Sequence, residues 1–205
     1  LPHGLANYIA LLGWAPGDNQ EIFKWEDLQK AFSIERINRS ASIYDPHKLD
    51  WVNGEHLRSM PDEVFISAAL EYLKARGRLK WNELMVYAVL PIFKDNISLF
   101  EELPDRLEFL SDDFPYENQD VIRTPEAKEI FKESLTILKE MMSGGHGSTS
   151  LQFDSFIEVL KPRVKAKGKN LFMPIRIALT GKAHGPELKL LFPALGMDGV
   201  RERFA

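Results

Sequence analysis

The sequence predicts an all-α protein built from two consecutive helical bundles. Apolar residues recur at intervals of three and four along most of the 205 residues, which is the spacing of an amphipathic helix. Proline and glycine fall at the ends of these periodic segments, where helices begin and stop. No stretch combines sustained apolar–polar alternation with hairpin turns, so we expect few strands.

Four helices are expected in the first half of the chain. The second of them has Asp45 as its N-cap and Pro46 at its first position, a common way to begin a helix. The third should stop at Gly77, and Pro91 should kink or interrupt the fourth. The expected segments are residues 5–13, 46–59, 61–77 and 81–93. A break near residues 75–78 marks the junction between a smaller and a larger helical unit.

The second half of the chain should hold one long helix and three short ones. Thr124 and Pro125 supply the cap and first position of the long helix, and Glu126 suits its dipole. This helix should run to about Met142, and a flexible loop should follow at residues 143–150. The short helices are expected at residues 153–164, 174–179 and 186–195.

Composition and motifs indicate a binding module rather than an enzyme. The chain has no cysteine, which excludes disulfides and thiol catalysis, and no apolar run long enough to span a membrane. Its five histidines are scattered without metal-ligand spacing, so we expect no metal site. No Walker loop, G-x-S-x-G elbow or paired acid and base stands out, so we expect no catalytic residue. The start at Leu1, without methionine, suggests a piece of a longer protein.

A basic run near the C-terminus is the strongest functional signal. Residues 161–186 carry seven Lys and Arg and no Asp or Glu, although the whole chain has a net charge of −4. Such a run attracts polyanions, and its cations can neutralise phosphates. A solvated basic surface remains the alternative. The cations expected on RNA phosphates are Lys161, Arg163, Lys165, Lys167, Lys169 and Lys182.

Two arginines are candidates for base recognition. Arg176 should point outward from a short amphipathic helix that packs through Ile175, Ala178 and Leu179, and outward Arg can bond or stack on an unpaired base. Arg58 lies at the end of the helix that begins after Asp45. The alternative for both is an ordinary surface cation, and for Arg58 the dipole of the helix C-terminus favours that reading. Phe172 and Phe192 are better suited to core packing than to stacking on bases.

The segment from residue 95 to residue 120 is acidic. It has nine acids against one base, Arg106, and would be repelled by phosphates. We expect a solvated acidic surface away from any nucleic acid. The alternative function is a helical protein-interaction module that uses this acidic surface.

Three segments resemble the bacterial-type glutamyl-tRNA synthetase family. The first is residues 5–23, which resemble the segment beyond the family's KMSKS loop. Residues 44–54 resemble the signature F-D-x-x-K-L-x-W-x-N-G, with Tyr44 in place of Phe. Residues 174–181 resemble P-L-R-x-A-L-T-G, with Ile175 in place of Leu. The middle of the chain resembles the family only in helical character and length.

The resemblance implies an anticodon-binding superdomain. Residues 1–22 would be the tail of a stem-contact domain, 23–78 a first helical anticodon-binding subdomain and 79–205 a second. The family's H-I-G-H and KMSKS motifs are not in this sequence, so the fragment should not activate glutamate alone or need a cofactor. The parent would join glutamate to tRNA with ATP and magnesium. We expect a monomer that binds glutamate tRNA, without DNA or membrane partners, in the cytoplasm, or in an organelle if the source is eukaryotic.

The resemblance also assigns individual residues. Arg58 matches the position that reads the third anticodon base, where Arg is typical of enzymes that discriminate against glutamine tRNA. Arg176 matches the signature Arg that contacts anticodon bases. Gly185, Pro186 and Leu188 match a loop that touches the first two bases. Gly185 replaces Thr or Ser of some members, and Met173 replaces a frequent Gln, so side-chain contacts there are not carried over.

Overall fold

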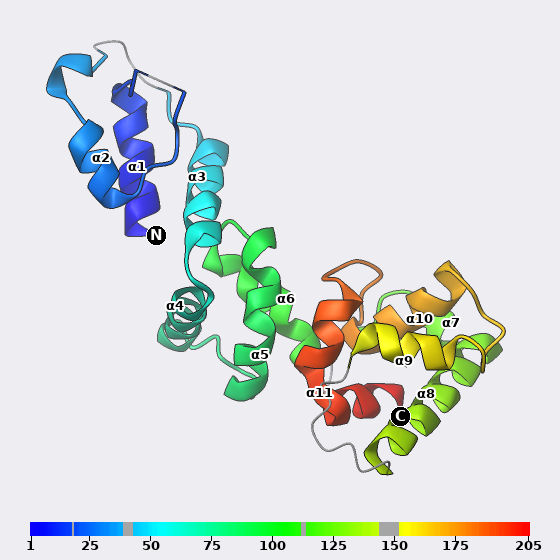
Figure 1. The fold of residues 1–205 in the computed structure, drawn as a ribbon. Helices are drawn as coiled ribbons and strands as arrows, with labels where there is room; N and C mark the ends of the chain where they lie inside the picture. The colour runs from blue at the N-terminus through cyan, green and yellow to red at the C-terminus, as the bar shows by residue number, and fades with distance from the viewer. Residues whose placement is uncertain (18, 39–42, 112–113, 144–151) are drawn as a thin grey trace. The chain divides into compact units, whose positions relative to one another are not determined.

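The computed structural model describes residues 1–17, 19–38, 43–111, 114–143 and 152–205. These residues form eleven α-helices and four short 3-10 helices (Figure 1). Among the described residues, the only β-type backbone pairing is one isolated antiparallel bridge between Trp14 and Ile37. The prediction of an all-α fold is therefore confirmed. Within the described residues, no helix has both the length and the apolar character needed to span a bilayer.

The chain folds into two compact units that do not follow the sequence order strictly. The first unit contains residues 1–78 and 93–105, and the second contains residues 79–92 and 106–205. The return of residues 93–105 to the first unit has no signal in the sequence. The domain boundaries inferred from the family resemblance remain predictions.

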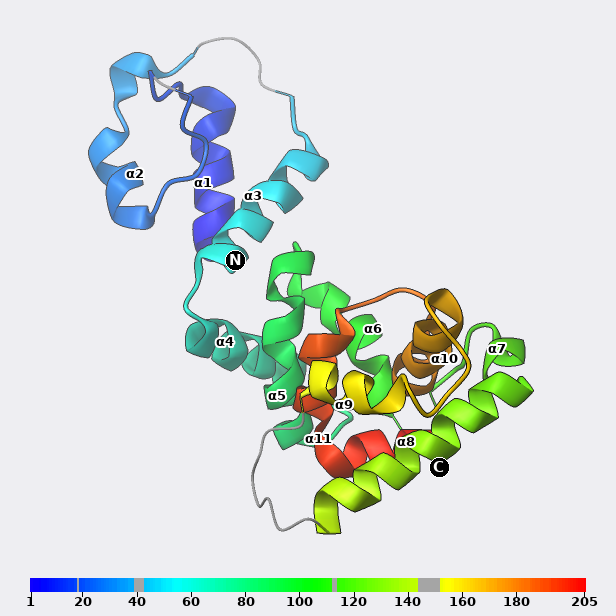
Figure 2. The ribbon, with the colours of Figure 1, turned by 45° about the vertical axis from the view of Figure 1, so that its right-hand side comes forward.

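The first unit is built around three helices. Helix α1 (Pro2–Gly13) packs against α2 (Trp25–Ala31) and α3 (Pro46–Ser59), as Figures 1 and 2 show. A short 3-10 helix, η1 (Ile34–Arg36), follows α2, and α4 (Asp62–Ala75) follows α3. Trp14, Phe23 and Leu28 form one buried cluster of this unit. The core also contains fully buried side chains of α3 and α4, namely Val52, Leu57, Phe65, Ala69 and Leu73.

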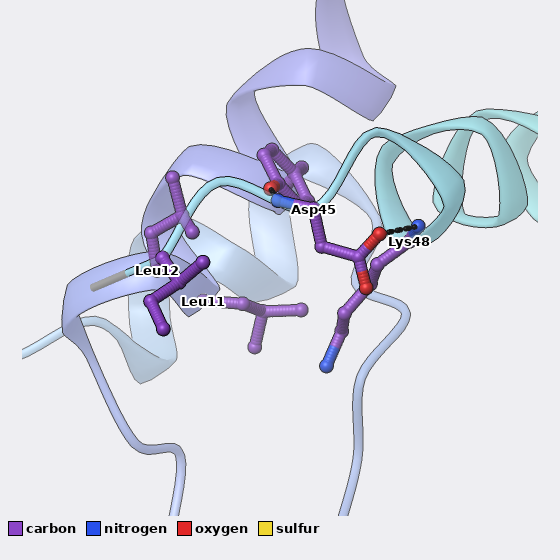
Figure 3. A pocket seen from close by; sticks show the side chains of 6 residues that line it. Leu11, Leu12, Asp45 and Lys48 are labelled. Atoms are coloured by element: carbon purple, nitrogen blue, oxygen red, sulfur yellow. Dashed lines mark hydrogen bonds between the residues drawn. The ribbon is translucent and has the colours of Figure 1, made fainter.

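The start of α3 follows the predicted capping pattern. The Asp45 carboxylate accepts hydrogen bonds from the backbone N–H groups of His47 at 2.9 Å and Lys48 at 3.2 Å. The Asp45 N–H in turn donates to the Tyr8 hydroxyl of α1 at 2.7 Å. These groups border a cavity of about 250 Å³ whose other side chains are Leu11, Leu12, Ile43 and Lys48 (Figure 3). The same residue therefore caps α3 and fixes its start against α1.

The second unit contains a bundle around one long helix. Helix α8 (Pro125–Ser143) packs against α7, α9, α10 and α11 (Figures 1 and 2). Ile130, Ile137 and Leu138 of α8 are buried, as are Phe156 of α9 and Phe192 of α11. The bounds of these neighbours are α7 (Gln119–Arg123), α9 (Phe153–Leu160), α10 (Lys169–Thr180) and α11 (Leu188–Phe204).

The remaining elements lie between α4 and α7 in the sequence. They are α5 (Glu83–Phe93), η2 (Lys94–Asn96), η3 (Phe100–Glu102), α6 (Leu103–Leu107) and η4 (Glu108–Leu110). Helix α5 includes Pro91 and continues for two residues beyond it. Pro91 has no N–H to donate to the carbonyl of Tyr87, so α5 continues past the proline without that hydrogen bond.

Three predicted helix bounds in the second half were wrong. Helix α9 ends at Leu160, because Pro162 cannot continue it. Helix α10 begins at Lys169 rather than at Pro174, so the proline lies inside the helix. Helix α11 runs from Leu188 to Phe204 with a break at Gly196, whose φ is 69°. The predicted flexible loop lies, except for Ser143, outside the described residues.

Candidate nucleic-acid interface

Arg176 lies on a partly exposed face of α10. Ile175, Ala178 and Leu179 are buried, which confirms the predicted packing face. Arg176 itself is half-buried rather than fully outward, and this burial lowers the pKa of its guanidinium. Arginine starts from so high a pKa that the group stays charged at neutral pH. The structure therefore places a permanent, partly desolvated cation on this face.

The Arg176 guanidinium is joined to the turn that follows α10. Its Nη1 donates to the Pro186 carbonyl at 2.8 Å. A Cβ added to Gly185, whose φ is +149°, would lie 3.9 Å from the same Nη1. The structure thus brings together three of the residues predicted from the sequence: Arg176, Gly185 and Pro186. One guanidinium nitrogen is engaged by the protein, and the group has further donors that can meet a ligand.

The turn itself is held by a segment distant in sequence. The Glu117 N–H donates to the Gly181 carbonyl at 2.6 Å, and the Glu117 carboxylate accepts from the Ala183 N–H at 3.1 Å. Gly181 has a φ of +71°, and a Cβ there would lie 2.4 Å from the Pro115 carbonyl oxygen. Only glycine fits such a close approach in this conformation. Glu117 comes from the acidic segment that we expected to be solvated surface.

Leu188 is placed differently from its neighbours in the turn. Its side chain is 6% exposed and belongs to the core. It is the first residue of α11, where backbone N–H groups have no acceptor within the helix. A contact from Leu188 to a ligand would therefore have to use its backbone.

Arg58 lies in the last turn of α3, in the first unit. Its Nη2 lies 2.9 Å from Oε1 of Glu55, one turn earlier on the helix, and both side chains are about one-third exposed, at 29% and 35%. The position also fits a cation stabilised by the helix dipole. Arg58 and Arg176 belong to different units.

The basic run separates into paired and exposed cations. Arg163 makes two hydrogen bonds to the Glu140 carboxylate, at 3.1 and 2.8 Å, which lower the pKa of Glu140. Lys182 lies 4.0 Å from Glu108. Lys161, Lys165, Lys167 and Lys169 are exposed, and no ion pair joins any of these four to another described residue.

Two of the exposed lysines lie at or just before the N-terminus of α10, where a positive charge lowers helix stability. Lys169 opens α10, Lys167 precedes it, and the first turn contains no acid. The positive end of a helix dipole favours acids and repels cations. A sequence that breaks a local rule without compensation often does so at a functional site. This arrangement suits an anionic ligand.

Other candidate groups prove structural. Phe192 is buried, which confirms its core role, and Phe172 is half-buried with its ring centroid 6.3 Å from that of Phe153. Among the described residues, no three His, Asp or Glu side chains gather closely enough to hold a metal ion.

Sequence reasoning missed the residues that support the two arginines. Glu117 contacts Ala183 across 66 positions, a separation that leaves no local signal. Glu55 is different, because its position three residues before Arg58 places both side chains on one helix face. The helical spacing would have been enough to identify that pair.

Comparison with known proteins gives a consistent family. The model of the family described as "Anticodon binding domain" matches residues 64–205. A glutamate–tRNA ligase of Clostridioides difficile (strain 630) is 31% identical, with 100% of this chain and 43% of the relative covered. One from Alkaliphilus metalliredigens (strain QYMF) is 33% identical, with 99% and 42% covered. The chain thus spans less than half the length of these curated relatives.

Solved structures show the same fold. A crystal structure of a glutamate tRNA ligase from Elizabethkingia meningosepticum CCUG26117 aligns over 100% of this chain and 40% of that one, with a TM-score of 0.79 and 20% identity. A glutamate–tRNA synthetase from Elizabethkingia anophelis aligns over the same shares, with a TM-score of 0.70 and 20% identity. The family model covers well over half of the chain, including the Arg176 site. This chain belongs to the anticodon-binding domain family.

Proposed function

We propose that this chain binds the anticodon of glutamate tRNA as the C-terminal region of a glutamate–tRNA ligase. The observation that carries the proposal is the Arg176–Pro186 contact, which lies inside the segment matched by the anticodon-binding family. The choice of glutamate as the amino acid in this proposal comes from the names of the two curated relatives, which are glutamate–tRNA ligases. The relatives are more than twice as long, so catalysis with ATP and magnesium would use parts outside this chain.

The proposed binding mode combines two kinds of contact. Anticodon bases are unpaired, so their edges are open to arginine and backbone groups. Arg176 and the Gly185–Pro186 backbone would meet the first two bases, and Arg58 would meet the third. Exposed lysines of the basic run would hold phosphates, which adds affinity but no sequence preference. Both arginines are partly buried, which strengthens their interaction with a ligand relative to fully solvated groups.

The alternative function receives less support. A protein-interaction surface on residues 95–120 needs acids that face a partner. Three of these acids act inside the molecule: Glu102 accepts from the Ser98 N–H at 2.8 Å, Glu108 lies near Lys182, and Glu117 accepts from Ala183. Their contacts account for part of the acidic character without a protein partner.

The proposal is tested by RNA affinity. We would titrate the chain with transcribed glutamate tRNA and glutamine tRNA in a filter-binding assay at two salt concentrations. The expected result is tighter binding of glutamate tRNA and a steep loss of affinity at the higher salt. Absence of binding to both RNAs at the lower salt would refute the proposal and favour the interaction-module alternative.

A further inference from the structure

We infer that Glu55 is a positioning residue, which holds the Arg58 guanidinium in the orientation that discriminates the third anticodon base. The inference rests on the proposed function and extends it, because it assigns a selectivity role to an acid that neither the family signature nor the comparisons single out. It also explains why a proposed RNA-reading cation is paired with a carboxylate on its own helix.

The Arg58 guanidinium lies in a recess formed by its own helix, which we call the Arg58 seat. Besides the Glu55 contact at 2.9 Å, its Nη2 and Nη1 atoms lie 3.0 and 3.1 Å from the point where a Cβ of Gly54 would be. Distances this short mean that the guanidinium occupies space that a side chain at position 54 would need. Because Gly54 has no side chain, the Arg58 guanidinium has room beside it, and Glu55 binds the Nη2 end of that group.

The turn around Ser98 also borders the Arg58 seat. The Ser98 hydroxyl lies 2.9 Å from the same Cβ point of Gly54. This turn is itself anchored, because the Asn53 amide donates to the Ser98 carbonyl at 2.5 Å and Glu102 accepts from the N–H groups of Ser98 and Leu99 at 2.8 and 3.0 Å. Residues 93–105 return to the first unit here, and so they complete the Arg58 seat.

Because Glu55 is negatively charged, its contribution to RNA binding is to orient the Arg58 guanidinium rather than to add affinity. A carboxylate beside a cation weakens attraction for a phosphate backbone. A site selected only for RNA affinity would therefore leave Arg58 without it. A fixed guanidinium fork, in contrast, presents its remaining donors in one direction, which favours a base with acceptors in matching places over one without them. Preorganisation of this kind improves discrimination at the expense of some non-specific attraction.

The test compares affinity and selectivity in one experiment. The probes are two anticodon stem-loop RNAs that differ only in the third anticodon base, which is C for glutamate and G for glutamine. For Glu55→Ala we expect both affinities to rise or stay level, because a negative charge is removed. We expect the affinity ratio between the two RNAs to fall roughly threefold to tenfold, which is the net value of one hydrogen bond between Arg58 and the base. Glu55→Gln, which keeps an acceptor, should retain more of the ratio.

The matched control is Glu71→Ala, which removes an exposed acid from α4 of the same unit. It should raise both affinities slightly and leave the ratio unchanged. A purely electrostatic role for Glu55 would give this same pattern in Glu55→Ala and overturn the inference. A purely structural role would lower both affinities together with the unfolding midpoint, and that result would also overturn it.

Arg58→Gln separates this inference from the proposed function. If Glu55 acts through Arg58, Glu55→Ala should not lower the ratio further in the Arg58→Gln background. If Arg58→Gln lowers the ratio while Glu55→Ala does not, the inference fails and the proposed role of Arg58 stands. If Arg58→Gln leaves the ratio unchanged in a chain that still binds both RNAs, Arg58 is not the reader and both ideas fail for this base.

Discussion

Arg176 combines a structural contact with a proposed reading role. Its guanidinium holds the Pro186 carbonyl, so Arg176→Ala removes both a cation and the brace of the turn. We expect affinity for the glutamate anticodon stem-loop to fall by about 1–3 kcal/mol, the usual value of a specific Arg contact. Filter binding measures this loss. Arg163→Ala is the control, because Arg163 is already paired with Glu140; an equal loss there would show that only charge matters.

His56 should make the stability of the first unit depend on pH. The Asn7 amide donates to the Glu21 carbonyl and its oxygen accepts from the Phe23 N–H, so His56 Nε2 donates to that same oxygen at 3.0 Å. Burial, and then His3 and the chain's amino terminus, lower the pKa of His56. The unfolded chain therefore takes up the proton first, near pH about 6.5. Stability falls as the pH drops through that value towards the lower folded pKa.

The measurement for His56 is urea unfolding at pH 8 and pH 5.5. The midpoint should fall on acidification, and it should fall less in His56→Gln, which keeps a donor for Asn7 but does not titrate. Equal acid sensitivity in the two proteins would mean that a titratable group other than His56 is responsible.

At the scale of one element, Asp45 should stabilise α3 through its cap. Asp45→Ala leaves the N–H groups of His47 and Lys48 without the carboxylate they now bind. The expected cost is about 1 kcal/mol of unfolding free energy, measured by urea titration. Asp45→Asn keeps a capping oxygen and should cost only a few tenths of that. If Asn proves as damaging as Ala, the carboxylate acts through something other than the cap.

The two helices whose sequences combine two start signals begin where the sequence predicts. Asp45–Pro46 and Thr124–Pro125 each combine a capping side chain with proline, and the structure starts α3 and α8 at those prolines. Pro174 has no such cap before it. The proline lies inside α10, where it has no N–H to donate to the carbonyl of Asn170. Gly168, with a φ of 54°, is the actual N-cap.

The candidate site was predictable only where its residues lie close in sequence. Arg176, Gly185 and Pro186 stand within ten positions, and the structure joins them. Glu117 and Ser98 reach their partners from other parts of the chain, through contacts set by tertiary packing. Sequence periodicity indicates which face of a helix is buried, but it does not indicate which distant loop covers the exposed face.

At the scale of the whole molecule, positive charge is concentrated in an acidic chain. The net charge is −4, so general attraction cannot bring RNA to this protein, and a local basic run has to do so. We expect Lys165→Ala with Lys167→Ala to reduce the salt dependence of RNA affinity. For each phosphate that the variant no longer neutralises, the slope of log affinity against log salt should become shallower by about 0.7 to 0.9.

The affinity ratio between the two stem-loops separates phosphate contacts from base reading. It should stay constant in this double variant, because phosphate contacts carry no sequence information. Lys128→Ala with Lys132→Ala makes the same change in net charge at two exposed positions of α8, outside the basic run. If that control flattens the salt slope equally, net charge and not the basic run governs binding. If only the first variant does so, the basic run is where the phosphates lie, and the arginines are left to distinguish the bases.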